Sequence, residues 1–397
     1  MAEITAIKLS KTRNSKKEQT IAATVYTKKS KATFAAPSGT SAGKHEAVFM
    51  PKPIDDVIKN AERNVVPALI GLDVEDQKSI DRTLIEVDGE HNFSSIGGSV
   101  STAVSAACLK SAAVVQKKEP YALLSQRPYK MPKLLGVCIA GGKHAENSTT
   151  FQEFLSIPIT DSVRTAVILN KRVHSLVGRK LKAKKRDFEG GWVKPGLTNE
   201  QALEIMSQAI SETSDATRSS IALGVDFAAS EFYSGGKYSY KTCKRNAREQ
   251  LKYASELIEK YGIYFAEDAF NEDDYTSFAT LTRLHGDVLV CGDDLFTTNA
   301  ERLKHGIKKR ACNSVIIKPN QIGTITQAEE TVRLAQKHGY ATVISHRSGE
   351  NYDGLLADLC VGWKIPFMKI GIVGKERTAK TNRLMIIEKL EAKEKRV

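Results

Sequence analysis

Residues 314–320 read SVIIKPN, a short apolar run that ends on a lysine. Continuous runs of this kind, without alternation of apolar and polar residues, are typical of parallel strands that are buried on both faces. Segments with helical periodicity separate successive runs, so the second half of the chain predicts repeated strand–helix units. The pattern recurs in IALGVD (221–226), IYFAED (263–268), VLVCGDD (288–294), TVISHR (342–347) and FMKIG (367–371).

Repeated strand–helix units over roughly 260 residues favour a (β/α) barrel. A doubly wound open sheet is the alternative, but no G-x-G-x-x-G phosphate motif follows any of these strands. Glycines at the ends of the helical segments predict left-handed C-caps. We expect helices to end at Gly262, Gly286, Gly306 and Gly339.

The N-terminal part of the chain has a different pattern. Three segments with the period of a strand (3–9, 19–27 and 31–37) precede three helical segments (53–69, 74–87 and 98–116). Strands followed by helices predict a small α+β domain. The polar, proline-containing stretch SQRPYKMP (125–132) is the best boundary. We therefore expect an α+β domain at 1–127 and a barrel domain at 128–397.

The composition is that of a globular chain, with 41% hydrophobic and 7% aromatic residues. No apolar stretch approaches the ~18 residues of a membrane span. The N-terminal residues lack the apolar block of a signal peptide. The six cysteines are scattered without a C-x-x-C pair, which favours reduced thiols. We expect a cytoplasmic protein with no membrane span.

The formal net charge is +13, and much of the excess lies in residues 8–31 and 179–186. Such runs are most simply a solvated surface that attracts small anions. No aromatic residues interleave with them as stacking platforms would require. No motif therefore indicates a nucleic acid or another polyanion as a partner, and the charge alone leaves that alternative open.

Each apolar run of the second half ends on charged or polar residues. In a parallel barrel all strands point the same way, so these side chains meet at the face where barrel active sites lie. A single charge after a strand carries little weight, but charges in consecutive units predict a functional site. In chain order they are Asp226, Glu267, Asp293, Lys318, His346 with Arg347, and Lys369.

The types of these residues indicate a chemistry. The three carboxylates have no nearby Cys or His ligand, and an all-oxygen set suits Mg²⁺. A lysine near Mg²⁺ and another cation favours its neutral form, which a general base requires, so Lys318 and Lys369 are both candidates for the base. The segment SHRSGE (345–350) offers Arg347, Ser348 and backbone N–H groups to a phosphate. Together they indicate proton abstraction next to a carboxylate on a phosphorylated substrate.

From about residue 35 to the C-terminus, the chain resembles a known family, the enolases (phosphopyruvate hydratases). The motifs that carry the resemblance are PSGTSAGKHEA (37–47), GGKHA (141–145), FQEF (151–154), EGG (189–191), GVDFAASEF (224–232), AEDAFNEDDY (266–275), GDDLFTTN (292–299), KPNQIG (318–323) and SHRSGE. The resemblance implies an α/β chain with an enolase-type (β/α)8 barrel behind a smaller α+β domain. It also implies Mg²⁺-dependent, reversible dehydration of 2-phosphoglycerate to phosphoenolpyruvate in glycolysis and gluconeogenesis.

The resemblance implies two Mg²⁺ ions per active site. Asp226, Glu267 and Asp293 would bind the tighter ion, and Ser41 would bind a second ion that arrives with the substrate phosphate. Lys318 would take the proton from C2 of the substrate. Glu189 would protonate the departing C3 hydroxyl.

The remaining matched residues would bind or surround the substrate. Lys369 would pair with its carboxylate, and Arg347 and Ser348 would hold its phosphate. The residues expected to line the site are His144, Gln152, Glu153 and His346. The family's usual assembly implies a homodimer or a higher homo-oligomer.

The chain departs from the family pattern in three places. Phe188 stands where the family has an acidic residue before Glu189, and Lys143 precedes His144 in place of a serine. TRNSKKEQT (12–20) replaces the family's SRGNPT. Two alternatives remain open: a superfamily dehydratase or isomerase for another carboxylate acid, or an enolase-fold polyanion-binding protein with weakened catalysis.

Overall fold

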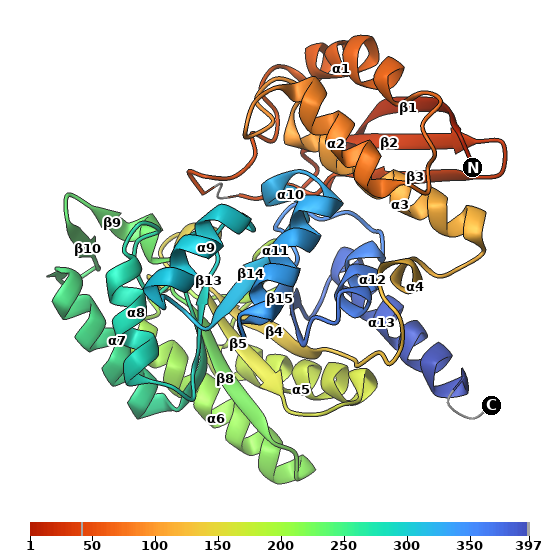
Figure 1. Cartoon of the computed structure of the whole chain (residues 1–397). Coiled ribbons are helices and arrows are strands. Elements are labelled where there is room, and N and C mark those ends of the chain that lie inside the picture. Colours follow the sequence, from red (N-terminus) through yellow and green to blue (C-terminus); the bar gives the residue numbers. More distant parts are fainter. Residues whose placement is uncertain (41–42, 395–397) are drawn as a thin grey trace.

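The computed structural model describes residues 1–40 and 43–394, which form two packed parts (Figure 1). The first part is an antiparallel sheet covered by helices, as the sequence predicts. Its strands are β1 (Ile4–Arg13), β2 (Gln19–Thr27) and β3 (Lys31–Ala35). Its helices are α1 (Ile54–Leu69), α2 (Gln77–Asp88) and α3 (Gly98–Gln116). The apolar side chains between the sheet and the helices form a core separate from that of the second part.

Among the described residues, α3 is the only helix long and apolar enough to cross a membrane. In the structure, 83% of its apolar window is buried, because α3 packs against β2 and β3 and is covered by α1 and α2. This burial is typical of the core helix of a globular domain. The short helix α4 (Pro120–Leu124) follows, and its Tyr121 packs into the core of the second part.

The second part is a closed barrel in which the six predicted strands are confirmed. The strand order is β4-β5-β8-β12-β13-β14-β15-β16, and pairing of β16 with β4 closes the sheet. Its strands are β4 (Lys133–Ala140), β5 (Glu153–Pro158), β8 (Ile221–Asp226), β12 (Ile263–Glu267), β13 (Leu289–Gly292), β14 (Ser314–Ile317), β15 (Ala341–Ser345) and β16 (Phe367–Gly371).

The barrel departs from the expected parallel pattern at β5, which runs antiparallel to both β4 and β8. Only the short 3₁₀ turn η1 (Gly142–His144) and loop residues separate β4 from β5, so the two strands form a hairpin instead of a strand–helix unit. A parallel connection usually passes through a helix, and η1 is the only helical element between Ala140 and Glu153. Because β5 is reversed, its first residue, Glu153, lies at the same end of the barrel as Asp226, the last residue of β8.

Helices surround the barrel (Figure 1). They are α5 (Val163–Leu181), α6 (Asn199–Thr217), α7 (Ala247–Tyr261), α8 (Tyr275–Leu284), α9 (Ala300–Lys309), α10 (Pro319–Ile322), α11 (Ile325–Lys337), α12 (Leu355–Gly362) and α13 (Lys375–Glu394). The hairpin β6 (Lys185–Arg186) and β7 (Trp192–Val193) extends the sheet beside β4. A small separate sheet and the 3₁₀ turn η2 follow β8: η2 (Ala229–Phe232), β9 (Tyr233–Ser234), β10 (Lys237–Ser239) and β11 (Lys244–Arg245).

Two of the expected helix ends are confirmed and two are wrong. Gly262 caps α7, and Gly339 directly follows the capping residue of α11, both with positive φ. Gly286 also directly follows the capping residue of α8, but its φ is not positive, so it is not a left-handed cap. Helix α9 continues through Gly306. A Cβ at residue 306 would lie 2.4 Å from a ring atom of Phe296, so this glycine allows close packing instead of ending a helix.

The N-terminal part is fixed to the barrel beside α10, which directly follows β14. Thr102 of α3 donates a hydrogen bond to the carbonyl of Gly323 at 3.2 Å. Ser105 and Asp81 accept from the backbone N–H groups of Ile325 (3.0 Å) and Thr326 (2.8 Å). These contacts hold the first part over the carboxyl end of the barrel.

We predict that Gly323→Ala destabilises the fold much more than Gly339→Ala. Both residues have positive φ, 104° and 75°, and both substitutions add backbone strain of about 1 kcal/mol or more. Only at Gly323 would the new Cβ meet another group, a ring atom of the buried Phe93 at 2.3 Å. Overpacking adds about 1–3 kcal/mol, so urea unfolding should show a loss of about 3 kcal/mol at Gly323 and about 1 kcal/mol at Gly339. Equal losses would contradict this packing.

Candidate active site

The carboxyl ends of the barrel strands surround a polar pocket with about 510 Å³ of open space. Asp226 ends β8, and Asp293, Lys318 and His346 directly follow β13, β14 and β15. Of the residues expected from the sequence, those that line the pocket are His144, Gln152, Glu153, Glu189, Asp226, Asp293, Lys318, His346, Arg347, Ser348 and Lys369. Glu267 contacts Lys369 beside the pocket. Ser41 lies outside the described residues.

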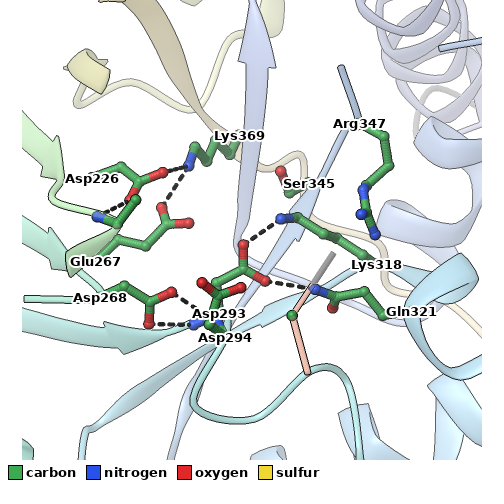
Figure 2. Close-up of polar contacts among 12 residues, drawn as sticks. Asp226, Glu267, Asp268, Asp293, Asp294, Lys318, Gln321, Ser345, Arg347 and Lys369 are labelled. Carbon is green, nitrogen blue, oxygen red and sulfur yellow. Dashed lines mark hydrogen bonds and ion pairs between the residues drawn. The ribbon is translucent and has the colours of Figure 1, made fainter. Parts of the chain in front are cut away.

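Lys369 contacts three carboxylates, of which Figure 2 shows those of Asp226 and Glu267. Its Nζ lies 2.8 Å from Asp226 Oδ2, 2.7 Å from Glu267 Oε2 and 2.8 Å from Glu153 Oε2. Burial opposes the charged ammonium, but the carboxylates raise the pKa of Lys369 well above its usual value. Burial and the neighbouring Asp226 raise the pKa of Glu267 to about 8. Lys369 is therefore a fixed positive charge in this cluster.

Lys318 makes a short ion pair with Asp293 across the pocket (Figure 2). The other oxygen of Asp293 accepts a hydrogen bond from Gln321 Nε2 at 2.9 Å. Burial would lower the pKa of Lys318, but Asp293 raises it above the usual value. This direction is opposite to the one expected for a base, because the expectation assumed a metal ion that would compete with Lys318 for Asp293.

The carboxylates have the chemistry of a metal site. Glu267 Oε1 is buried and has no hydrogen-bond partner in the part of the chain that the structure describes. Asp268 accepts from the N–H groups of Asp293 (2.9 Å) and Asp294 (2.8 Å), which fixes the loop that carries Asp293. Two groups have ligand atoms within 4.8 Å of one another: His144, Glu153 and Glu189, and Asp268, Asp293 and Asp294. The expected set of Asp226, Glu267 and Asp293 is not one of these groups; Lys369 contacts Asp226 and Glu267, and Lys318 contacts Asp293.

A histidine and a second glutamate hold Glu189. Arg377 Nη1 lies 2.7 Å from His346 Nδ1, and because a guanidinium can only donate, Nδ1 accepts. Nε2 of His346 then carries the ring proton and lies 2.9 Å from Glu189 Oε2. Burial lowers the pKa of His346 to about 4, so the ring is neutral near pH 7. In this tautomer the ring proton is on the nitrogen that lies beside Glu189.

Glu153 and Glu189 have carboxylate oxygens within 4.8 Å of each other. Burial, opposed by Lys369 and reinforced by Glu189, raises the pKa of Glu153 well above its usual value. Burial would also raise the pKa of Glu189, but His346 and His144 lower it well below that range. Two adjacent buried carboxyl groups titrate as a pair, and these directions favour one proton on the pair, held by Glu153.

Phe188 does not disturb Glu189. Phe188 is 58% exposed and is not among the residues that line the pocket. The loop is held instead by Asp187 Oδ1, which accepts from Gly191 N at 2.7 Å, and by Arg377 Nη2, which donates to the carbonyl of Phe188 at 2.9 Å. Burial raises the pKa of Asp187 to about 7. The backbone on both sides of Glu189 is therefore fixed without an acidic side chain at residue 188.

The opposite side of the pocket is cationic. Arg347 makes a two-pronged contact with Glu46 at 2.9 and 3.0 Å, and its Nη1 lies 3.3 Å from Asn320 Oδ1. Ser348 Oγ accepts from the hydroxyl of Thr40 at 2.7 Å. Lys143, beside His144, forms an ion pair with Glu231 at the pocket rim.

Several residues of the site were not expected from the sequence. Asp268 and Asp294 directly follow residues that were expected, so the pairs ED and DD at the strand ends could have indicated them. Glu46 lies within the motif PSGTSAGKHEA, and Asp187 stands two residues before EGG, but neither was assigned a role. Arg377 has no sequence signal, because it is one charged residue in the strongly charged helix α13.

Comparison with known proteins agrees with this geometry. The family described as "Enolase, N-terminal domain" matches residues 4–124, and "Enolase, C-terminal TIM barrel domain" matches residues 128–396. An enolase of Methanocorpusculum labreanum is 43% identical over 89% of this chain and 90% of its own length. Enolases of Natronomonas pharaonis and Methanosphaera stadtmanae are each 42% identical, over 98% and 96% of this chain and 99% and 96% of their own lengths.

The two family matches together cover almost the whole chain, and the relatives exceed 40% identity over at least 89% of it. The same chain brings the lysines, carboxylates and Arg347 of the quoted motifs into one pocket. This protein belongs to the enolase family, whose members are metal-dependent hydro-lyases.

Proposed function

We propose that this chain catalyses the reversible dehydration of 2-phosphoglycerate to phosphoenolpyruvate in glycolysis and gluconeogenesis. The observation that carries the proposal is one pocket in which Lys318 lies beside the carboxylate cluster and Glu189 lies beside Glu153. A base and an acid are the two groups that a β-elimination of water requires. No observation favours another carboxylate acid or a polyanion-binding role.

The first step is removal of the C2 proton, with Lys318 as the base. Negative charge then develops on the substrate carboxylate, and preorganised cations next to it lower the barrier. Lys369 is positioned as such a cation, because its buried ammonium stays charged. When bound, Mg²⁺ would stabilise the same charge, one ion held by Asp226, Glu267 and Asp293 and a second by Ser41.

The second step is loss of the C3 hydroxyl, protonated by Glu189. The proton held on the Glu153–Glu189 pair is the source, and His346 aims the Glu189 carboxyl. His144 and Gln152 complete this side of the pocket, with Gln152 Nε2 donating to Asp226 at 3.2 Å. Arg347 and Ser348 would hold the phosphate at the cationic side.

Three further assignments belong to the same proposal. We place the domain boundary between residues 127 and 128, in the stretch that joins the two cores. We assign the chain to the cytoplasm, which is consistent with six free cysteines, of which five are buried. We expect a homodimer or higher homo-oligomer, which light scattering of the purified protein would test.

We predict that Lys318→Ala lowers kcat by about 10³-fold, because a positioned base contributes roughly 10²–10⁴ to such a step. The measurement is phosphoenolpyruvate formation from 2-phosphoglycerate by ultraviolet absorbance. Lys337→Ala, at an exposed lysine of α11, is the control and should keep wild-type activity. A Lys318→Ala enzyme that kept more than a tenth of wild-type activity would rule out Lys318 as the base.

We predict that Glu189→Gln separates the two chemical steps. The variant cannot protonate the leaving hydroxyl, so dehydration should fall by at least about 10²-fold. Exchange of the C2 proton with deuterium from solvent, followed by NMR, should persist because Lys318 is intact. If dehydration and exchange fell by the same factor, Glu189 would act before or during proton abstraction.

We predict that Mg²⁺ raises the melting temperature and that the carboxylate cluster is responsible. An ion at 100 times its Kd stabilises the folded state by about 2.7 kcal/mol. Glu267→Gln should lose most of this gain, whereas Glu259→Gln, at an exposed acid on α7, should keep it. EDTA should abolish both the thermal shift and turnover in the wild type. An undiminished shift in Glu267→Gln would place the ion elsewhere.

A further inference from the structure

We propose that Lys16 is a positioning residue for the substrate phosphate. Its ammonium orients the hydroxyls of Thr40 and Ser348 so that Ser348 donates its own proton into the pocket. The inference rests on the proposed function, because it describes how the active-site pocket binds the phosphate of the substrate. Lys16 lies in the segment TRNSKKEQT, where this chain departs from the family pattern.

The turn between β1 and β2 is held on the loop that carries Ser348. Ser15 N donates to the carbonyl of Glu350 at 2.8 Å, and Glu350 N donates back to Ser15 Oγ at 3.0 Å. The hydroxyl of Ser15 donates to the carbonyl of Ser348 at 3.3 Å. Lys16, the next residue, is thereby held at the edge of the pocket.

The ammonium of Lys16 has three protons and, among residues 1–40 and 43–394, three neighbours. Nζ lies 2.7 Å from Glu18 Oε1, 3.1 Å from Thr40 Oγ1 and 5.3 Å from the centre of the Phe188 ring. The first two are a salt bridge and a hydrogen bond, and the third is a cation–π contact. The side chain is only 8% exposed, so these neighbours fix the direction of its N–H groups.

The donor character of the ammonium sets the direction of the hydrogen bonds that follow. An ammonium has no lone pair, so Thr40 Oγ1 must accept from Lys16 and can donate its own proton only elsewhere. It donates to Ser348 Oγ at 2.7 Å. Ser348 Oγ accepts there, and no residue in 1–40 or 43–394 takes its proton. That proton is left for an acceptor in the pocket, such as a phosphate oxygen. A charge at the start of such a chain strengthens each later donor.

Arg377 connects the backbone of Phe188 to the backbone of Ser348. Its guanidinium is fully buried, and Nη2 donates to the carbonyls of Phe188 (2.9 Å) and Ser348 (2.8 Å). The backbone at Phe188 is therefore fixed relative to the backbone at Ser348. Lys16 contacts the Phe188 ring and reaches Ser348 through Thr40. Phe188 and Lys16 both depart from the family pattern and contact each other. The contact accounts for an exposed phenylalanine beside the pocket.

The test compares Lys16→Met with wild type and with two reference variants. The phosphate is bound equally tightly in the ground state and in the transition state. A weaker interaction with the phosphate should therefore raise KM and leave kcat nearly unchanged. We expect KM for 2-phosphoglycerate and the Kd of inorganic phosphate, measured by calorimetry, to rise roughly three- to tenfold, the factor for one net hydrogen bond. Lys16→Arg keeps a donor and should restore most of the affinity. Lys17→Met removes a charge from the same turn and should change little.

A double-mutant comparison tests the relay itself. Thr40→Val breaks the chain at its middle, so adding Lys16→Met to Thr40→Val should weaken phosphate binding no further. Additive effects, an unchanged KM and Kd in Lys16→Met, or an equal effect of Lys17→Met would each overturn the proposal. Calorimetry with inorganic phosphate does not depend on turnover. Failure of the wild type to convert 2-phosphoglycerate would therefore refute the proposed function separately from the role of Lys16.

Discussion

The site depends on one constraint: acids and lysines are buried together at the carboxyl end of the barrel, and each charge needs a partner. An unpaired buried charge costs several kcal/mol, and removal of one partner leaves the other uncompensated. Strand register satisfies the constraint. Asp226 is paired in register with both Glu153 and Glu267, and Lys369 is in register with the last residue of β15. The closed barrel therefore brings Lys369 within 2.8 Å of all three carboxylates.

The N-terminal part completes this charge balance on the phosphate side. Glu46 neutralises Arg347 through two contacts at 2.9 and 3.0 Å, and Thr40 reaches Ser348. Neither residue belongs to the barrel, so the substrate pocket is formed only where the two parts meet. The contacts of Asp81 and Thr102 with the start of α11 and with Gly323 hold that arrangement in place.

Much of the barrel and of the site could be predicted from the sequence, because strands buried on both faces are apolar throughout and end in charges. The reversal of β5 could not, since a short apolar run does not state its direction and the twelve residues between β4 and β5 are long enough for either kind of connection. The predicted helix end at Gly306 was wrong because the sequence does not distinguish a glycine required for close packing against Phe296 from a glycine required for positive φ. The roles of Arg377 and Lys16 could not be predicted, because both residues contact residues far away in the sequence and no local sequence pattern indicates such contacts.

The measurement that tests the central claim most directly is turnover by the wild-type protein. Purified protein with 2-phosphoglycerate and Mg²⁺ should produce phosphoenolpyruvate, seen as rising ultraviolet absorbance, and the reaction should stop when EDTA is added. The same preparation given phosphoenolpyruvate should form 2-phosphoglycerate, because the reaction is reversible. Absence of phosphoenolpyruvate from a folded, Mg²⁺-loaded protein would contradict the account.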